Sequence, residues 1–179
     1  MSKILISLMF AMIFFVGSCG GGDKGDTGDT GNTGDTGNTG NTGDTGNNFP
    51  NEHDGLNWSD RSANFMTWDE AITYCENLGG RLPTISELRT LIQNCPGTET
   101  GGECGVTDSC LSYDDCRNDA CSGCEYDESG KYSVFGDTYW LWSSSEHSDR
   151  TEYAWGVVFV SGRVYSNLKD YNNVVRCVQ

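Results

Sequence analysis

Residues 67–88, TWDEAITYCENLGGRLPTISEL, carry two helix starts in close succession. Thr67 with Glu70, and Thr84 with Glu87, each match the capping box Thr-x-x-Glu. In a capping box each side chain accepts a hydrogen bond from the other residue's free backbone N–H, which stabilises the first helical turn. This stretch therefore predicts two helices separated by a short connection.

Both predicted helices have defined ends. Apolar residues recur at helical spacing over 68–78, and Gly79-Gly80 then supplies the left-handed conformation of a C-cap. A second apolar stripe spans 85–92, and Pro96 with Gly97 stops it. Because the residue before Pro83 avoids helical angles, we expect the connection to be extended.

The C-terminal part predicts an antiparallel sheet. Its β-branched and aromatic segments lie at 139–142, 153–160, 163–165 and 174–178. A serine-rich turn at 143–145 is expected after the first segment, and Ser161-Gly162 fits a two-residue hairpin turn. Two helices followed by a small antiparallel sheet predict an α+β fold.

The amino-terminal residues predict export and lipid attachment. Lys3 precedes a mostly apolar run over 4–16, which is shorter than the roughly 20 residues that cross a bilayer. The next residues, Gly17-Ser18-Cys19, resemble the signal box of bacterial lipoproteins. This resemblance implies that residues 1–18 are a cleaved signal peptide and that Cys19 is lipidated, which would hold the protein at a bacterial membrane, on the outer membrane or cell surface. The alternative is an ordinary export signal with an incidental thiol.

Residues 19–48 form a predicted collagen-like linker. Glycine occupies every third position from Gly22 to Gly46, and the other positions are mostly Asp or Asn followed by Thr. A strict Gly-X-Y period is typical of collagen, but this tract lacks the proline that stiffens collagen chains. Two interpretations stay open, a mobile hydrophilic spacer and a local triple helix that joins three copies.

Residues 49–179 form the one predicted globular domain. They contain 21 acidic and 9 basic side chains, a net charge of −12 within the −15 of the whole chain. Binding to nucleic acid needs a basic face, so this charge excludes nucleic acid as a partner. It also argues against attachment to anionic membranes through protein charge.

The cysteine pattern predicts a disulfide-rich loop. Eight cysteines follow Cys19, and an even number in an exported chain favours disulfides over metal thiolates. Six fall where few apolar residues could hold structure: Cys95, Cys104, Cys110, Cys116, Cys121 and Cys124. Because six cysteines allow 15 pairings, the pairing among these six stays open. A zinc site or a redox site at the Cys-x-x-Cys of 121–124 is the less favoured alternative.

Cys75 and Cys177 stand apart from that group. Cys75 lies on the apolar face of the first predicted helix and Cys177 on the last predicted strand. A bond between them would join the two ends of the domain and close a loop of about 100 residues, worth up to ~4.7 kcal/mol in the chain-entropy treatment.

The run over 67–84, with its Trp-x-x-Ala-x-x-x-Cys helix and Gly-Gly, resembles the start of a C-type-lectin-like domain. Together with 139–145, 154–159 and 175–178, it resembles more closely the C-terminal domain family of the Legionella collagen-like adhesin. The order of signal, collagen-like tract and C-terminal domain is also the same. The resemblance covers 65–95 and 139–178, most of the domain.

This resemblance carries several expectations. In the lectin-like fold the helix cysteine pairs with the last-strand cysteine, which implies a Cys75–Cys177 disulfide. The adhesin binds sulfated host polysaccharides as a trimer, so attachment to a surface and a homotrimer are implied here. Nine scattered basic residues do not favour a polyanion as the ligand. The Glu-Pro-Asn and Trp-Asn-Asp motifs of calcium-dependent lectins are absent from the sequence, so that activity is not implied.

One aromatic and polar region is the candidate ligand-binding surface. Its residues are Trp140, Trp142, Glu146, Asp149 and Tyr153. Aromatic faces flanked by hydrogen-bonding groups suit sugar rings or protein hot spots, so an extracellular glycan or protein is the expected partner. The alternative places both tryptophans in the core. Because they point to the same side of one strand, we expect them to be buried or exposed together.

Three classes of function compete. The first is a lipid-anchored surface protein that displays a lectin-like domain for adhesion. The second is an enzyme, because Tyr74-Cys75-Glu76 and 80–84 also resemble the sulfatase-modifying enzymes; the chain is too short for them and lacks their Asn-Gly-Asn-Val-Trp-Glu-Trp stretch. His147 beside 143–145 shows no triad order, so we expect no enzyme activity. The third is a structural coat protein with no ligand.

No cofactor and no metal site is predicted. Acidic residues at 114–115, Asp119 and 127–128 could hold calcium, yet their spacing matches no calcium loop, and a solvated charged loop is the alternative. His53 and His147 are expected to be ordinary surface residues.

Overall fold

A computed structural model describes residues 47–179 of the chain. The predicted signal peptide at 1–18, the lipidation of Cys19 and nearly all of the 19–48 linker lie outside the described residues. Within the described part, no helix is long and apolar enough to cross a membrane.

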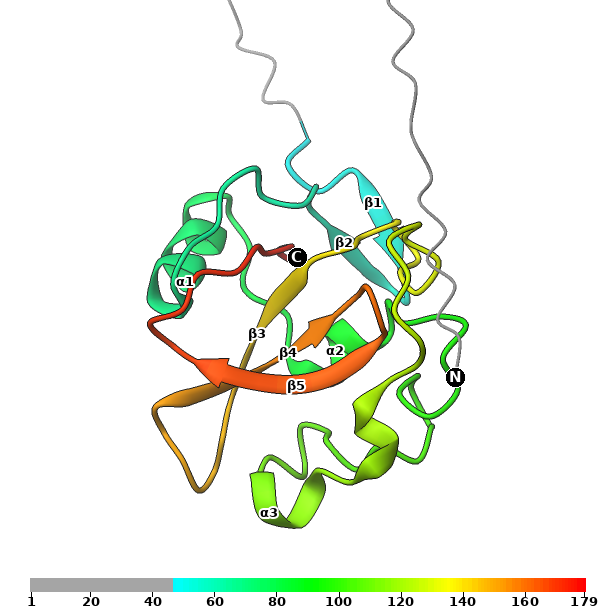
Figure 1. The fold of residues 1–179 in the computed structure, drawn as a ribbon. Coiled ribbons are helices and arrows are strands. Elements are labelled where there is room, and N and C mark those ends of the chain that lie inside the picture. Colours follow the sequence, from blue (N-terminus) through cyan, green and yellow to red (C-terminus); the bar gives the residue numbers. More distant parts are fainter. Residues whose placement is uncertain (1–46) are drawn as a thin grey trace, which may run out of the picture. The chain divides into compact units, whose positions relative to one another are not determined.

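The domain is a disulfide-rich α+β fold, and Figure 1 shows its helices and strands. Its elements are β1 (Asn51–His53), β2 (Leu56–Trp58), α1 (Trp68–Asn77), α2 (Ile85–Arg89), α3 (Tyr113–Cys116), the 3₁₀ helix η1 (Asp119–Ser122), β3 (Trp140–Glu146), β4 (Tyr153–Val158) and β5 (Arg163–Leu168). Strands β1 and β2 form a hairpin, while β3, β4 and β5 form a second antiparallel sheet in chain order.

Both capping boxes are formed. Thr67 and Glu70 close the start of α1, and Thr84 and Glu87 close the start of α2, each through the two reciprocal hydrogen bonds. Helix α2 is shorter than the apolar stripe over 85–92 predicts, because beyond Arg89 the chain continues in tight i→i+3 turns.

The predicted serine-rich turn at 143–145 is wrong, because β3 runs through it. Each serine hydroxyl there bonds to a backbone group. Ser143 Oγ donates to the Trp155 carbonyl at 2.8 Å, and Ser145 Oγ accepts from the Ile85 N–H at 2.9 Å. The second contact satisfies a free donor at the start of α2, so these serines join β3 to its neighbours.

Two further strand predictions need correction. The β4–β5 connection has four residues, 159–162, because Val158 pairs with Arg163 and Phe159 already belongs to the turn. The predicted final strand over 174–178 is an extended segment with isolated bridges to different partners: Leu141, Trp58 and Arg81. It crosses between the two sheets and therefore cannot follow one neighbour for its whole length.

The core lies on both faces of the β3–β4–β5 sheet. On one face, α2 and the disulfide-rich segment pack against Leu141, Trp155 and Val157, all fully buried. On the other face, α1 packs over Trp142 and Ala154. The α1 side of the core also includes residues from the two ends of the domain.

Four disulfides cross-link the domain. The structure joins Cys75 to Cys177, the pair that the resemblance implies, across 102 residues of sequence. The pairs that the sequence left open are Cys95–Cys124, Cys104–Cys121 and Cys110–Cys116. The first two are nested, and the third closes a small loop that carries α3.

Candidate ligand-binding surface

Helix α1 covers only part of its face of the sheet. Strand pairing places Trp140, Val158 and Arg163 in one row across β3, β4 and β5, and Trp142, Gly156 and Tyr165 in the next row. Paired residues of an antiparallel sheet point to the same side. Trp142 and Gly156 are buried, while the remaining four side chains stay partly exposed.

Gly156 makes room for the Trp140 ring. A Cβ atom at this glycine would lie 2.7 Å from Trp140 Nε1, so any side chain there would displace the indole. With that space open, the indole contacts Tyr165 with ring centroids 6.0 Å apart. The indole N–H is buried and has no hydrogen-bond partner among the described residues. Trp140 and Tyr165 therefore form an aromatic pair on the uncovered part of the face.

Two arginines meet on the same tyrosine ring. The guanidinium carbon of Arg163, two residues before Tyr165 on β5, lies 3.9 Å from the Tyr165 ring centroid. That of Arg117, which follows α3, lies 5.3 Å from it. Arg117 directly follows Cys116, whose disulfide to Cys110 restricts the backbone at this point. We call Trp140, Val158, Arg163, Tyr165 and Arg117 the arginine–aromatic face.

These two arginines differ from the other basic residues of the domain. Six of the nine form ion pairs with carboxylates: Arg61, Arg81, Lys131, Arg150, Lys169 and Arg176. Arg89 is buried and donates to three backbone carbonyls, of Thr98, Glu99 and Val106. Within residues 47–179, Arg117 and Arg163 make no carboxylate contact, and the Nε of each is buried without a partner. In a domain of net charge −12, this face is a local concentration of unpaired positive charge.

The structure separates the two tryptophans of the predicted binding surface. Trp142 is fully buried under α1, and its indole donates to the Met66 carbonyl at 3.1 Å, so it belongs to the core and cannot contact a ligand. Trp140, two residues earlier, stays partly exposed. The expectation that both share one environment is wrong, because α1 covers only one end of this face.

The three polar residues of the predicted surface lie away from Trp140. Glu146 ends β3 and pairs with Lys169 at 2.6 Å. Asp149 accepts hydrogen bonds from the Tyr113 N–H and the Ser112 hydroxyl, which hold its pKa below the usual range, so it fastens α3 to the β3–β4 connection. Tyr153 stacks on His147 with centroids 5.4 Å apart. The five predicted residues therefore do not form one surface.

His147 is buried, which corrects its prediction as a surface residue. Its ring packs among Tyr113, Tyr153 and Trp155, with centroid distances of 4.5 to 5.6 Å. Neither ring nitrogen has a hydrogen-bond partner among the described residues, and Asp149 Oδ1 lies 3.8 Å from Nδ1. Burial disfavours the charged imidazole and lowers the pKa of His147.

The acidic residues do not gather into a metal site. Among residues 47–179, no group of three or more His, Cys, Asp or Glu side chains could hold a metal ion. Asp114 pairs with Arg150 at 2.9 Å, and Asp127 pairs with Lys131 at 3.0 Å. Bonds from Ser129 and Lys131 lower the pKa of Asp127 to about 2. These carboxylates are thus bound to neighbouring side chains.

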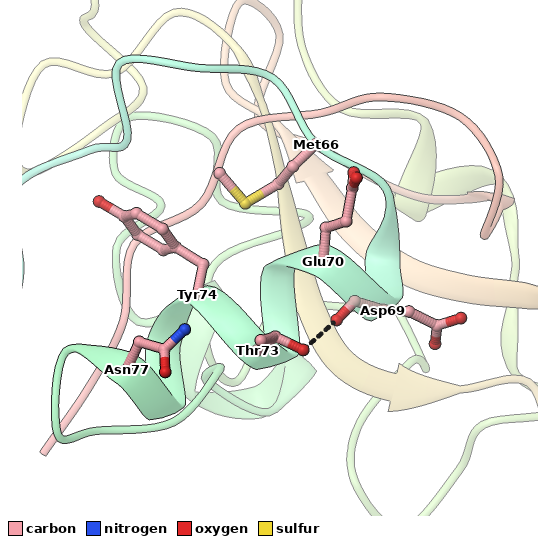
Figure 2. Close-up of a pocket in the computed structure, with 6 residues that line it drawn as sticks. All are labelled: Met66, Asp69, Glu70, Thr73, Tyr74 and Asn77. Atoms are coloured by element: carbon pink, nitrogen blue, oxygen red, sulfur yellow. Dashed lines mark hydrogen bonds between the residues drawn. The ribbon is translucent and has the colours of Figure 1, made fainter.

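A hollow of about 470 Å³ lies on the outer side of α1 (Figure 2). Met66 and Tyr74 form its apolar part, and Asp69 and Glu70 lie at its acidic end. Glu70 accepts hydrogen bonds from the N–H and the hydroxyl of Thr67 at 2.9 Å each. Its carboxylate therefore serves the helix cap, and we do not assign the hollow a ligand.

Sequence reasoning missed Arg117, Arg163 and Tyr165 as members of the surface. The pair Arg163-x-Tyr165 on a predicted strand was a usable signal, because alternate strand residues share a side. Nothing in the sequence placed Arg117 near them, because that depends on the disulfide pairing.

These features define a disulfide-rich α+β domain of a kind that fits a surface-binding role in general. A model of the Lcl C-terminal domain family matches residues 49–179, and the chain belongs to this family. The match confirms the resemblance to the C-terminal domain of the Legionella collagen-like adhesin. No curated protein and no solved structure matches the chain significantly.

Proposed function

We propose that this chain is a lipid-anchored surface protein that uses its C-terminal domain for adhesion, and that its ligand is a glycan with an acidic group. The observation that carries the proposal is the arginine–aromatic face. Arg117 and Arg163 are the two basic side chains of the domain bound to neither carboxylates nor backbone carbonyls in the described residues, and they converge on one partly exposed tyrosine.

The chemistry of this face suits an acidic sugar. Guanidinium groups donate paired hydrogen bonds to carboxylate or sulfate oxygens, and such charge-assisted bonds are about twice as strong as neutral ones. The partly exposed Trp140 indole provides an apolar surface for a sugar ring, beside the guanidinium groups that stack on Tyr165. The acidic remainder of the domain would repel a long polyanion, so we propose isolated acidic groups on an otherwise uncharged glycan.

Binding rather than catalysis is proposed. The hydroxyls of Ser143 and Ser145 bond to backbone groups of Trp155 and Ile85, and both nitrogens of His147 lack a hydrogen-bond partner among the described residues. No serine–imidazole pair of the kind that activates a nucleophile is therefore formed there.

We also propose that the fold is a C-type-lectin-like one. The Cys75–Cys177 bond, which joins the first helix to the C-terminal segment, supports this assignment. Backbone bonds in both directions between Asn57 and Gln179 also bring the two ends of the domain together.

The binding test uses the full-length chain, purified from membranes in detergent, on an array of acidic glycans and their uncharged counterparts. We expect the wild type to bind acidic glycans, and Arg163→Ala and Arg117→Ala each to weaken this binding roughly tenfold or more, the value of a charge-assisted hydrogen bond. Added salt should weaken binding as well.

Arg81→Ala is the matched control, because it removes the same charge from an exposed position outside the face. Equal binding by the wild type and the Arg117→Ala/Arg163→Ala double variant would overturn the site. Binding to matrix proteins with no binding to any glycan would overturn the ligand class.

The anchor has a separate test. Mass spectrometry of the mature protein should find an acylated amino-terminal residue at Cys19, and Cys19→Ala should release the protein from the membrane fraction. An unmodified Cys19 in the mature chain would refute the anchor and leave the binding site untouched.

A further inference from the structure

A second pocket lies at the end of the sheet that carries the β4–β5 turn. It has a volume of about 410 Å³ and is lined by Tyr126, Glu128, Thr138, Tyr139 and Val160. The volume falls in the range of pockets that take small molecules, about 300–1,000 Å³. We call it the tyrosine pocket.

Exposed aromatic rings gather at this pocket. Tyr126 is 68% exposed and Tyr139 41% exposed, and they are two of the five large apolar side chains exposed among residues 47–179. A third, Phe65, meets the Tyr139 ring edge-on at 5.6 Å. Since exposed apolar surface that gathers in one place usually marks an interaction site, this clustering points to a ligand.

The Tyr139 side chain forms one wall of the pocket and is held in place although it is exposed. The guanidinium of Arg61 stacks over the Tyr139 ring at 4.4 Å. The Arg61 Nε lies 3.8 Å from the carboxylate of Asp137, which is buried. Phe65 also contacts the ring, edge-on. The ring therefore presents a fixed surface to the pocket and loses little freedom when a ligand binds.

The opposite wall, the loop that carries Tyr126 and Glu128, is also fixed. The Cys95–Cys124 disulfide anchors its start. The Asp127 N–H donates to the Val160 carbonyl at 2.7 Å, and this bond joins the loop to the β4–β5 turn. The Tyr126 hydroxyl donates to the Glu128 carboxylate, which orients both side chains at the pocket.

We propose that the tyrosine pocket is a subsite for an uncharged pyranose unit of the glycan, an inference that rests on the proposed glycan-binding function. The two tyrosine rings match the apolar face of a sugar, while the Glu128 carboxylate and the Thr138 hydroxyl can accept hydrogen bonds from sugar hydroxyls. The Glu128 charge repels acidic sugars, which the arginine–aromatic face attracts instead.

The two sites flank one turn. Val160 lies in the β4–β5 turn and Arg163 begins β5, while Tyr139 directly precedes Trp140, the first residue of β3. Both sites thus lie at the same end of the sheet, and a glycan chain that reaches across this end would place an acidic unit on the arginine–aromatic face and an uncharged unit in the tyrosine pocket. Two weak subsites on one chain add avidity.

The test uses the full-length chain on an array of uncharged oligosaccharides and their sulfated and carboxylated counterparts. We expect Tyr126→Ala to weaken binding of the uncharged members about tenfold, the value of one aromatic contact. Glu128→Gln, which keeps the shape but removes the charge, should improve binding of acidic members relative to uncharged ones.

Tyr171→Ala is the matched control, since Tyr171 is 55% exposed and is not among the residues that line the pocket. Arg163→Ala should leave uncharged members bound as before, which separates this subsite from the arginine–aromatic face. Failure of the wild type to bind any uncharged oligosaccharide, or equal binding by wild type and Tyr126→Ala, would overturn the proposal. If Arg163→Ala loses only the binding of acidic oligosaccharides, the result supports the proposal, because the uncharged subsite then works independently of the arginine–aromatic face.

Discussion

The segment between Cys95 and Cys124 and the half of the domain around α1 are ordered by different means. Three disulfides lie in the first, with sequence separations of 29, 17 and 6 residues, whereas the α1 half has the single long Cys75–Cys177 bond and an apolar core. In the first, the cystine sulfurs also replace aliphatic side chains: four of its half-cystines are at most 4% exposed and belong to the main core cluster. A segment poor in apolar residues can thus join a core through its cross-links.

The largest expected effect separates the two kinds of cross-link. Replacing Cys75 and Cys177 by serine opens a loop of about 100 residues and should lower the free energy of unfolding by ~4.7 kcal/mol. Replacing Cys104 and Cys121, which are 17 residues apart, should lower it by ~3 kcal/mol. Guanidinium denaturation of the full-length oxidised variants measures both. An equal loss in the two variants would show that local strain or packing, and not loop length, determines how much each disulfide stabilises the domain.

The next effect tests the polar contact that supports the packed half. Arg176 makes two hydrogen bonds to Asp137, at 2.8 and 3.0 Å, and both side chains are buried. Asp137→Asn should destabilise the domain by about 3–5 kcal/mol, because it leaves the arginine charge buried without its partner. Asp127→Asn, which breaks the more exposed pair with Lys131, is the control and should leave the unfolding midpoint nearly unchanged. Similar losses of stability in both variants would contradict the claim that the buried Arg176–Asp137 pair matters more than the exposed Lys131–Asp127 pair.

A smaller effect compares helix caps in the two regions. Thr84→Ala removes the capping box of α2 and should cost about 1 kcal/mol. Ser112→Ala removes the cap of α3, where Cys110–Cys116 already closes the turn, so we expect a smaller loss. Thermal denaturation of both variants gives the difference. A larger loss for Ser112→Ala would mean that α3 relies on the Ser112 hydroxyl, through its cap bond and its bond to Asp149, more than on the disulfide.

The smallest effect concerns pH at the junction of the regions, where His147 contacts Tyr113 of α3. Its pKa is lowered in the folded domain, so at a pH above its ordinary value of 6.5 the imidazole is neutral in both states. As the pH falls below 6.5, the unfolded chain gains a proton that the folded domain resists, and stability decreases. His147→Phe should flatten the stability profile between neutral and mildly acidic pH. If the stability profile of this variant is unchanged, groups other than His147 cause the loss of stability at acidic pH.

The sequence could predict those parts of the fold that depend on local chemistry. The capping boxes at Thr67 and Thr84 follow from residues three positions apart, and both are formed. Prediction failed where distant chain segments decide the outcome. Ser143 to Ser145 look like a turn, yet their hydroxyls bond to the backbone of other elements and allow β3 to continue.

The binding surface was less predictable for the same reason. Whether Trp140 or Trp142 is exposed depends on how far α1 reaches over the sheet, and the Trp140 orientation depends on the missing side chain at Gly156. The position of Arg117 depends on which of the 15 pairings the six clustered cysteines adopt. The aromatic composition of the region was visible in advance, but its arrangement was not.

Phe49, the first buried residue of the domain, packs against Gly80 beside the C-terminal segment, and a short distance along the chain Cys75 is bonded to Cys177. If the protein is anchored at its amino end while the sheet binds a glycan, a pulling force acts on the domain first at Phe49. Residues 49–74 then unravel first, a reserve of roughly 90 Å at about 3.4 Å per residue. Beyond Cys75 the Cys75–Cys177 disulfide divides the tension between the two arms of the covalent ring that lead to the proposed subsites. A pulling force would therefore extend residues 49–74 before it distorts the residues that bind the glycan.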